Sequence, residues 1–120
     1  MKSQARPPQP AIPYTALVGQ VLLGHRVRNR LHQNDLAVAL GVTQSAYSRI
    51  EQGDTTVSIS QLRVIARRLG VSPGDLLREA DGLAARLQVQ GVEVSDEKGL
   101  QPAAVMIGLG ILAAILAASK

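Results

Sequence analysis

The sequence lacks cysteine, phenylalanine and tryptophan, and its only aromatic residues are two tyrosines. Without cysteine, disulfides and thiolate metal sites are excluded. With so few aromatic side chains, a core must be built from Leu, Val, Ile and Ala, which suits a compact helical bundle. A length of 120 residues predicts one small folded domain with appended segments.

Signatures of catalysis are also scarce. His25 and His32 do not belong to a cluster with metal-ligand spacing. No Ser-His-Asp set, phosphate loop or pair of carboxylates stands out in the sequence. We therefore expect a protein that is not an enzyme and that uses no metal or cofactor. The net charge of +4 favours a polyanionic partner.

The order of helix signals along the chain predicts five short helices. Residues 1–13 are rich in proline and lack an apolar core segment, so they predict a flexible arm and not a signal peptide. Apolar periodicity and capping residues then predict helices over 16–29, 33–40, 44–51 and 58–69, and a fifth from residue 73. Thr15 is a plausible N-cap of the first of these helices.

The boundaries of the later helices are set by residues with specific conformational preferences. Gly41 stands where a left-handed residue ends the second helix, and Thr43 is placed to cap the third. Ser58 and Gln61 form a capping box. Pro73 takes the first position of the fifth helix. Residues 14–80 therefore read as one helical domain, followed by a linker at 81–101 with a short strand within 87–94.

The segment from Val18 to Leu77 resembles the lambda-Cro-like, or Xre-type, helix-turn-helix repressor domain. The matching residues are Arg26, Leu31, Gln33, Leu36, Ala37, Leu40-Gly41-Val42-Thr43-Gln44, Ser48-Arg49-Ile50-Glu51, Gly53, Leu62, Ile65-Ala66, Leu69-Gly70-Val71-Ser72 and Leu76-Leu77. The spacing holds without a gap through five elements. The resemblance implies an all-α fold: a five-helix lambda-repressor-like domain, here with an extra apolar C-terminal helix.

The resemblance also implies which residues meet DNA. The set comprises Gln33, Thr43, Gln44, Ser45, Ser48 and Arg49. Gln33 would contact a phosphate and support Gln44, while Gln44 and Ser45 would face bases from the start of the recognition helix. A Gln side chain can pair with adenine N6 and N7, and Arg49 suits guanine or a phosphate.

Two further positions carry structural expectations. Arg26 and Glu51 would form a buried ion pair between the first and third helices, as the resemblance implies. Arg30 replaces a usual glycine in the turn between the first two helices, which predicts local strain or a different turn there.

The chain continues into an apolar segment over residues 102–119, of which 103–118 carry no charge. At 100° per residue it has no polar face, so a covering of lipid or protein is required. Gly110, Ala114 and Ala118 form a row of small residues that permits close helix approach. Two interpretations remain: a C-terminal membrane anchor, or an oligomerisation helix covered by partner chains.

Two functions follow from these patterns. The first is a sequence-specific DNA-binding transcriptional regulator, a dimeric repressor-like protein that acts on double-stranded DNA in the cytoplasm. The alternative is a helix-turn-helix module tethered to the inner membrane by residues 102–119 and used for protein–protein interaction, as in cytoskeletal or morphogenesis proteins. The polar start of the third helix favours the first function, the DNA-binding regulator.

Overall fold

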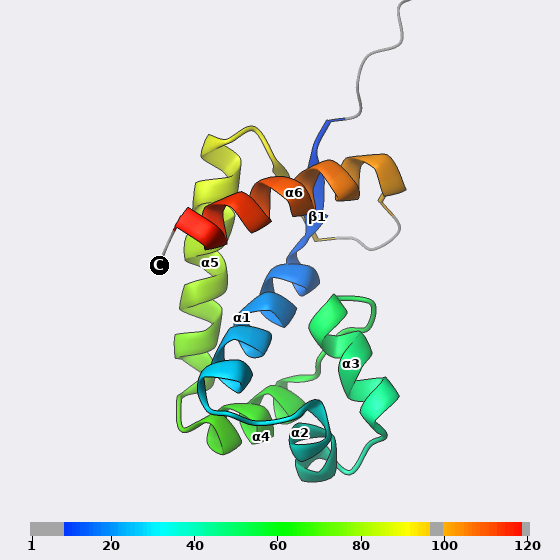
Figure 1. Ribbon diagram of the computed structural model, residues 1–120, viewed down its shortest axis with the longest axis vertical. Coiled ribbons are helices and arrows are strands. Elements are labelled where there is room, and N and C mark those ends of the chain that lie inside the picture. The colour runs from blue at the N-terminus through cyan, green and yellow to red at the C-terminus, as the bar shows by residue number, and fades with distance from the viewer. Residues whose placement is uncertain (1–8, 97–99, 119–120) are drawn as a thin grey trace, which may run out of the picture.

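The computed structural model describes residues 9–96 and 100–118 (Figure 1). Its elements follow in the order β1 (Ala11–Pro13), α1 (Tyr14–Arg28), α2 (Gln33–Leu40), α3 (Gln44–Gln52), α4 (Ile59–Leu69), α5 (Pro73–Val89), β2 (Glu93–Ser95) and α6 (Pro102–Ala118). The predicted class, five helices followed by an apolar C-terminal helix, is confirmed for the described residues. Figure 1 shows α2, α3 and α4 at one end of the molecule, and α6 lying across β1 and α5 at the other.

The helix-turn-helix forms where its local signals predict it. Gly41 ends α2 in the left-handed region, with φ of 71°. The Thr43 hydroxyl accepts a hydrogen bond from the Ala46 backbone N–H at 3.1 Å, which satisfies one free donor in the first turn of α3. Ser58 and Gln61 form the expected reciprocal capping box at the start of α4.

The beginning and end of α1 differ from the prediction. The helix starts at Tyr14 with Pro13 as its N-cap, so Thr15 is not the cap. The Thr15 hydroxyl instead donates to the Gly53 carbonyl at 3.0 Å, which ties α1 to the end of α3. Arg30 follows α1 with φ of 58°, a left-handed conformation that a non-glycine residue adopts at some cost.

The core is aliphatic, as the composition requires, and includes one tyrosine. It draws residues from β1, from every helix and from the segment between α5 and β2. Its largest fully buried side chains are Ile12, Leu17, Leu22, Leu36, Tyr47, Ile65, Leu76, Leu87, Val92 and Leu112. Because Ile12, Leu87 and Val92 belong to this set, the packed unit extends on both sides of the predicted 14–80 domain.

The segment predicted as a linker is largely structured. Helix α5 continues to Val89, and β2 then pairs in parallel with β1 so that Ala11 lies opposite Glu93. The strand was predicted a few residues too early, and its partner is the end of the segment read as a flexible arm. The rest of that arm, residues 1–8, and linker residues 97–99 lie outside the described residues.

The apolar segment forms α6 and packs against its own chain. Ala104, Gly108, Leu112 and Ile115 are buried, whereas the predicted small row Gly110, Ala114 and Ala118 is exposed. Neither interpretation of the tail anticipated cover from the same chain. In the part of the chain that the structure describes, no helix combines the length and apolar character needed to cross a membrane.

Candidate nucleic-acid interface

The N-terminal two thirds of α3, residues 44–49, presents polar side chains to solvent. Gln44, Ser45 and Arg49 are exposed, and within residues 9–96 and 100–118 none of the three makes a side-chain hydrogen bond or an ion pair. Their donors and acceptors are therefore available to a ligand. They stand on a helix whose N-terminal N–H groups also favour a nearby anion.

The other predicted DNA-facing residues already have partners inside the protein. The Thr43 hydroxyl caps α3, and the Ser48 hydroxyl accepts a hydrogen bond from the Gln52 amide at 3.2 Å. The Gln33 amide donates a hydrogen bond to the Glu51 carboxylate at 3.0 Å, whereas the resemblance implied support of Gln44. Gln33, Thr43 and Ser48 are thus less free to contact DNA than the three residues above.

Glu51 is the centre of a buried polar cluster. Its carboxylate, only 2% exposed, accepts hydrogen bonds from Arg26 Nε at 2.7 Å and Arg26 Nη2 at 3.1 Å. Arg26 Nη1 also donates to the Leu31 carbonyl at 3.0 Å. The hydrogen bond with Glu51 raises the pKa of Arg26 above its usual value. Together with Gln33, this cluster joins α1, α2 and α3 and fixes α3 relative to its neighbours.

A close crossing of α1 and α3 adds to this fixation. A Cβ atom at Gly19 would lie 2.1 Å from the Glu51 carbonyl oxygen, so only glycine fits there. At Gly53, a Cβ would meet the Ala16 backbone at 2.5 Å. Gly19 was not predicted as a contact, because a single glycine inside a helical pattern does not reveal which distant segment crosses it. Helix α3 is thus held against α1 by backbone contact.

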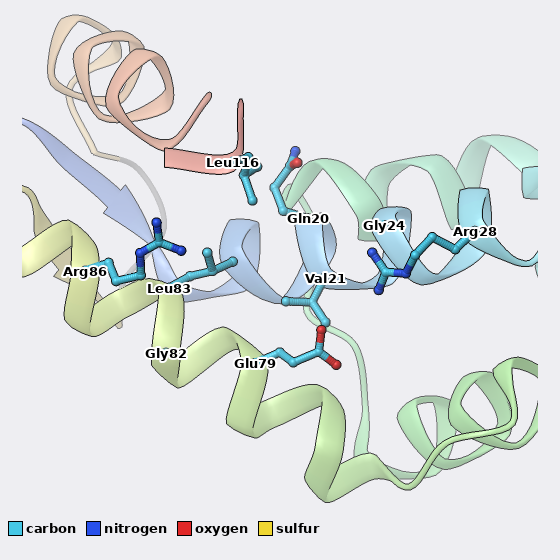
Figure 2. Close-up of a pocket in the computed structure, with 9 residues that line it drawn as sticks. All are labelled: Gln20, Val21, Gly24, Arg28, Glu79, Gly82, Leu83, Arg86 and Leu116. Atoms are coloured by element: carbon cyan, nitrogen blue, oxygen red, sulfur yellow. The ribbon is translucent and has the colours of Figure 1, made fainter. Parts of the chain in front are cut away.

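A separate groove of about 330 Å³ lies between α1 and α5 (Figure 2). Gly24 and Gly82 contribute no side chains to it, and Leu116 of α6 reaches one end near Gln20. Its wall includes Glu79, which pairs with His25 at 2.6 Å. The wall combines Glu79 with Arg28 and Arg86, and this mixture of signs makes the groove a weaker candidate for a polyanion than the exposed polar side chains of α3. No group of three or more metal-binding side chains occurs among the described residues.

Comparisons with known proteins identify a family for this part of the chain. A helix-turn-helix family model matches residues 25–76, which include α2 and α3. Two crystal structures of the clp gene regulator ClgR from Corynebacterium glutamicum are similar, each with 30% sequence identity. One gives a TM-score of 0.62 over 69% of this chain and 86% of that one, and the other 0.55 over 57% and 90%. No curated protein sequence matches the chain.

Proposed function

The chain belongs to the Xre/Cro-like helix-turn-helix family of DNA-binding regulators, and from this premise we propose that it recognises a specific operator through residues 44–49 of α3. The observation that carries the proposal is the exposure of Gln44, Ser45 and Arg49 on a helix whose opposite side packs against α1 and α2. A major groove admits one α-helix and presents the donors and acceptors that such side chains can read.

The three residues have different roles in this proposal. Gln44 pairs with an adenine, because its amide can donate to N7 and accept from N6. The Ser45 hydroxyl donates a hydrogen bond to a neighbouring phosphate, or it donates to or accepts from a neighbouring base edge. Arg49 contacts guanine or a phosphate one turn further along α3. The backbone N–H groups at the starts of α2 and α3 contribute phosphate contacts that position the protein without reading sequence.

We propose further that the protein acts as a dimer and represses by occupying its operator. The similar crystal structures are of a gene regulator, which supports a regulatory role. A dimer would bind two half-sites about one helical turn apart, and a two-fold protein predicts a palindromic operator.

The test uses the full chain and a site selected from random duplex DNA. Gln44→Ala is expected to lose about 1–3 kcal/mol on the selected site and to relax the preference at one base pair. Gln88→Ala, which truncates an exposed glutamine on α5, is the matched control and should bind as wild type does. If Gln44→Ala retains both affinity and preference, the assignment of base readout to this residue is wrong.

The dependence on salt separates this function from its alternative. Phosphate neutralisation releases counterions, so affinity for DNA should fall steeply and linearly with the logarithm of salt concentration. A chain that shows no salt-dependent affinity for any selected duplex would instead support the protein-interaction module.

A further inference from the structure

Two glycines face the groove between α1 and α5. Gly24 lies inside α1 and Gly82 lies inside α5, and both line the space of about 330 Å³ (Figure 2). Alanine would stabilise either helix more, because glycine loses more conformational freedom when a helix forms. The presence of glycine at both positions therefore needs a reason outside the helices themselves.

The packing of the fold does not supply that reason. A Cβ atom at Gly82 would have nothing within 4 Å, and one at Gly24 would meet only the end of the Arg28 side chain, whose Nη1 would lie 3.3 Å away. Gly19 is the contrast, because a Cβ there would lie 2.1 Å from a backbone oxygen of α3. What Gly24 and Gly82 have in common is the groove, which side chains at these positions would narrow.

The lining of the groove has the character of a small-molecule site. Val21 of α1, Leu83 of α5 and Leu116 of α6 supply apolar surface, and polar side chains join them. Ligand pockets are mostly apolar with a few polar groups, measure about 300–1,000 Å³, and often lie between the helices of a bundle. The volume of this groove is at the lower end of that range, so its occupant is a small molecule with an apolar body.

The charges of the groove define the polar end of that molecule. In the part of the chain that the structure describes, the Arg28 guanidinium makes no hydrogen bond or ion pair. Figure 2 shows its side chain running back along α1 toward Gly24. Glu79 is paired with His25 at 2.6 Å, and Arg86 is already engaged within the protein. Arg28 is therefore the cation that an anionic ligand would use.

We propose that the groove binds a small amphipathic carboxylate, a molecule with one carboxylate and an apolar body. The carboxylate accepts paired hydrogen bonds from the Arg28 guanidinium, whose planar fork matches its two oxygens. The apolar body lies over the two glycines and contacts Val21 and Leu83. A single negative charge meets less repulsion from Glu79 than a doubly charged phosphate would.

A molecule in this groove touches three helices. The walls belong to α1 and α5, and Leu116 of α6 reaches one end near Gln20 (Figure 2). Because the groove exists only in the folded chain, its ligand stabilises the fold by mass action. The urea midpoint should therefore rise with ligand concentration, and amide hydrogen exchange near Leu116 should slow. This site does not rest on the proposed function, and its measurements use no DNA.

Isothermal titration calorimetry on the full-length protein tests the class of ligand with three probes. Octanoate has a carboxylate and an apolar chain, octanamide has the same size without the charge, and acetate has the charge without the chain. We expect octanoate to bind at least about tenfold more tightly than octanamide, because hydrogen bonds to charged groups are the stronger ones. Acetate should not bind at the same concentrations. Equal affinities for octanoate and octanamide, or no binding of octanoate at millimolar concentration, would overturn the proposal.

Substitution of Arg28 tests the anchor of the carboxylate. Arg28→Met keeps the length of the side chain without its charge, so the preference for octanoate over octanamide should disappear. Arg28→Lys should keep part of that preference, because the charge remains but the fork is lost. Arg68→Met removes an exposed arginine of α4 outside the groove and should bind octanoate as wild type does. A full preference in Arg28→Met would show that another group holds the carboxylate.

Substitution of Gly82 tests the location and separates it from misfolding. Leucine is a better helix former than glycine, so Gly82→Leu should raise the urea midpoint. The same side chain occupies the groove and should weaken octanoate binding by at least about tenfold. Ala85→Leu places leucine on the exposed side of α5 outside the groove and should leave the affinity unchanged. Wild-type affinity in Gly82→Leu would place the ligand elsewhere and refute the site.

Discussion

Removal of the Glu51 carboxylate tests how α3 is held in place. Glu51→Ala deletes the acceptor of two Arg26 hydrogen bonds and of one from Gln33. The Arg26 side chain is 14% exposed, so its guanidinium would be left largely buried without its counter-charge. The effect is therefore expected on folding stability before any effect on DNA chemistry.

The magnitude follows from the desolvation of the stranded charge. Breaking a buried pair by removing one partner costs about 3–5 kcal/mol. We expect about 3 kcal/mol, the lower end, because the residual exposure of Arg26 lets water reach part of the guanidinium. Against a typical total of about 5–15 kcal/mol, this is a large share of the stability of the fold.

Urea unfolding followed by circular dichroism measures the loss. With a slope of about 2 kcal/mol per molar, the midpoint should fall by roughly 1.5 M. Glu93→Ala, which truncates an exposed glutamate, is the control and should shift the midpoint little. The double variant Arg26→Met/Glu51→Leu should regain more than half of the loss, because no buried charge remains. A Glu51→Ala midpoint within error of wild type would refute the reasoning.

Two further predictions concern the other end of the molecule. Gly108→Ala should loosen α6 by about 1–3 kcal/mol because its Cβ meets the Ala11 carbonyl. Gly110→Ala, which meets nothing, should instead stabilise the helix, and amide hydrogen exchange in α6 distinguishes the two. Burial, together with its hydrogen bond to Asp81, raises the pKa of Tyr14 from 10.0 to about 12. The contribution of the neutral Tyr14 side chain to the free energy of unfolding is complete below about pH 10 and is lost as pH rises through about 12. The urea midpoint of wild type should therefore fall more than that of Tyr14→Phe over this interval, and parallel curves would contradict the assignment.

The parts of the fold that the sequence predicts well depend on local chemistry. Thr43 caps α3 and Gly41 ends α2 through contacts with residues only a few positions away, so their roles can be read directly from the chain. The exposed start of α3 follows from the same signals. The central pair of Arg26 with Glu51 was expected only through the family resemblance, because nothing local connects the two positions.

The parts that could not be predicted depend on distant segments. Strand β1 gains its partner only when Glu93 arrives opposite Ala11. The inward face of α6 is chosen by contact of Gly108 with Ala11, whereas the isolated helix is apolar on every side. The length of α5 is an intermediate case: Leu83 and Leu87 continue the spacing of Leu76 and Ala80, but Gly82 interrupts the run of helix-forming residues.

The pairing of β1 with β2 has a consequence for biosynthesis. Ile12, fully buried in the finished protein, leaves the ribosome ahead of the helices, whereas its neighbour Val94 follows after roughly 80 more residues. At about 5–20 residues per second, β1 waits roughly 4–16 s for its partner strand. The helices α1 to α4 form from nearer contacts in the meantime. The nascent chain can thus acquire its DNA-reading end while the strand-paired end still exposes an apolar edge to chaperones.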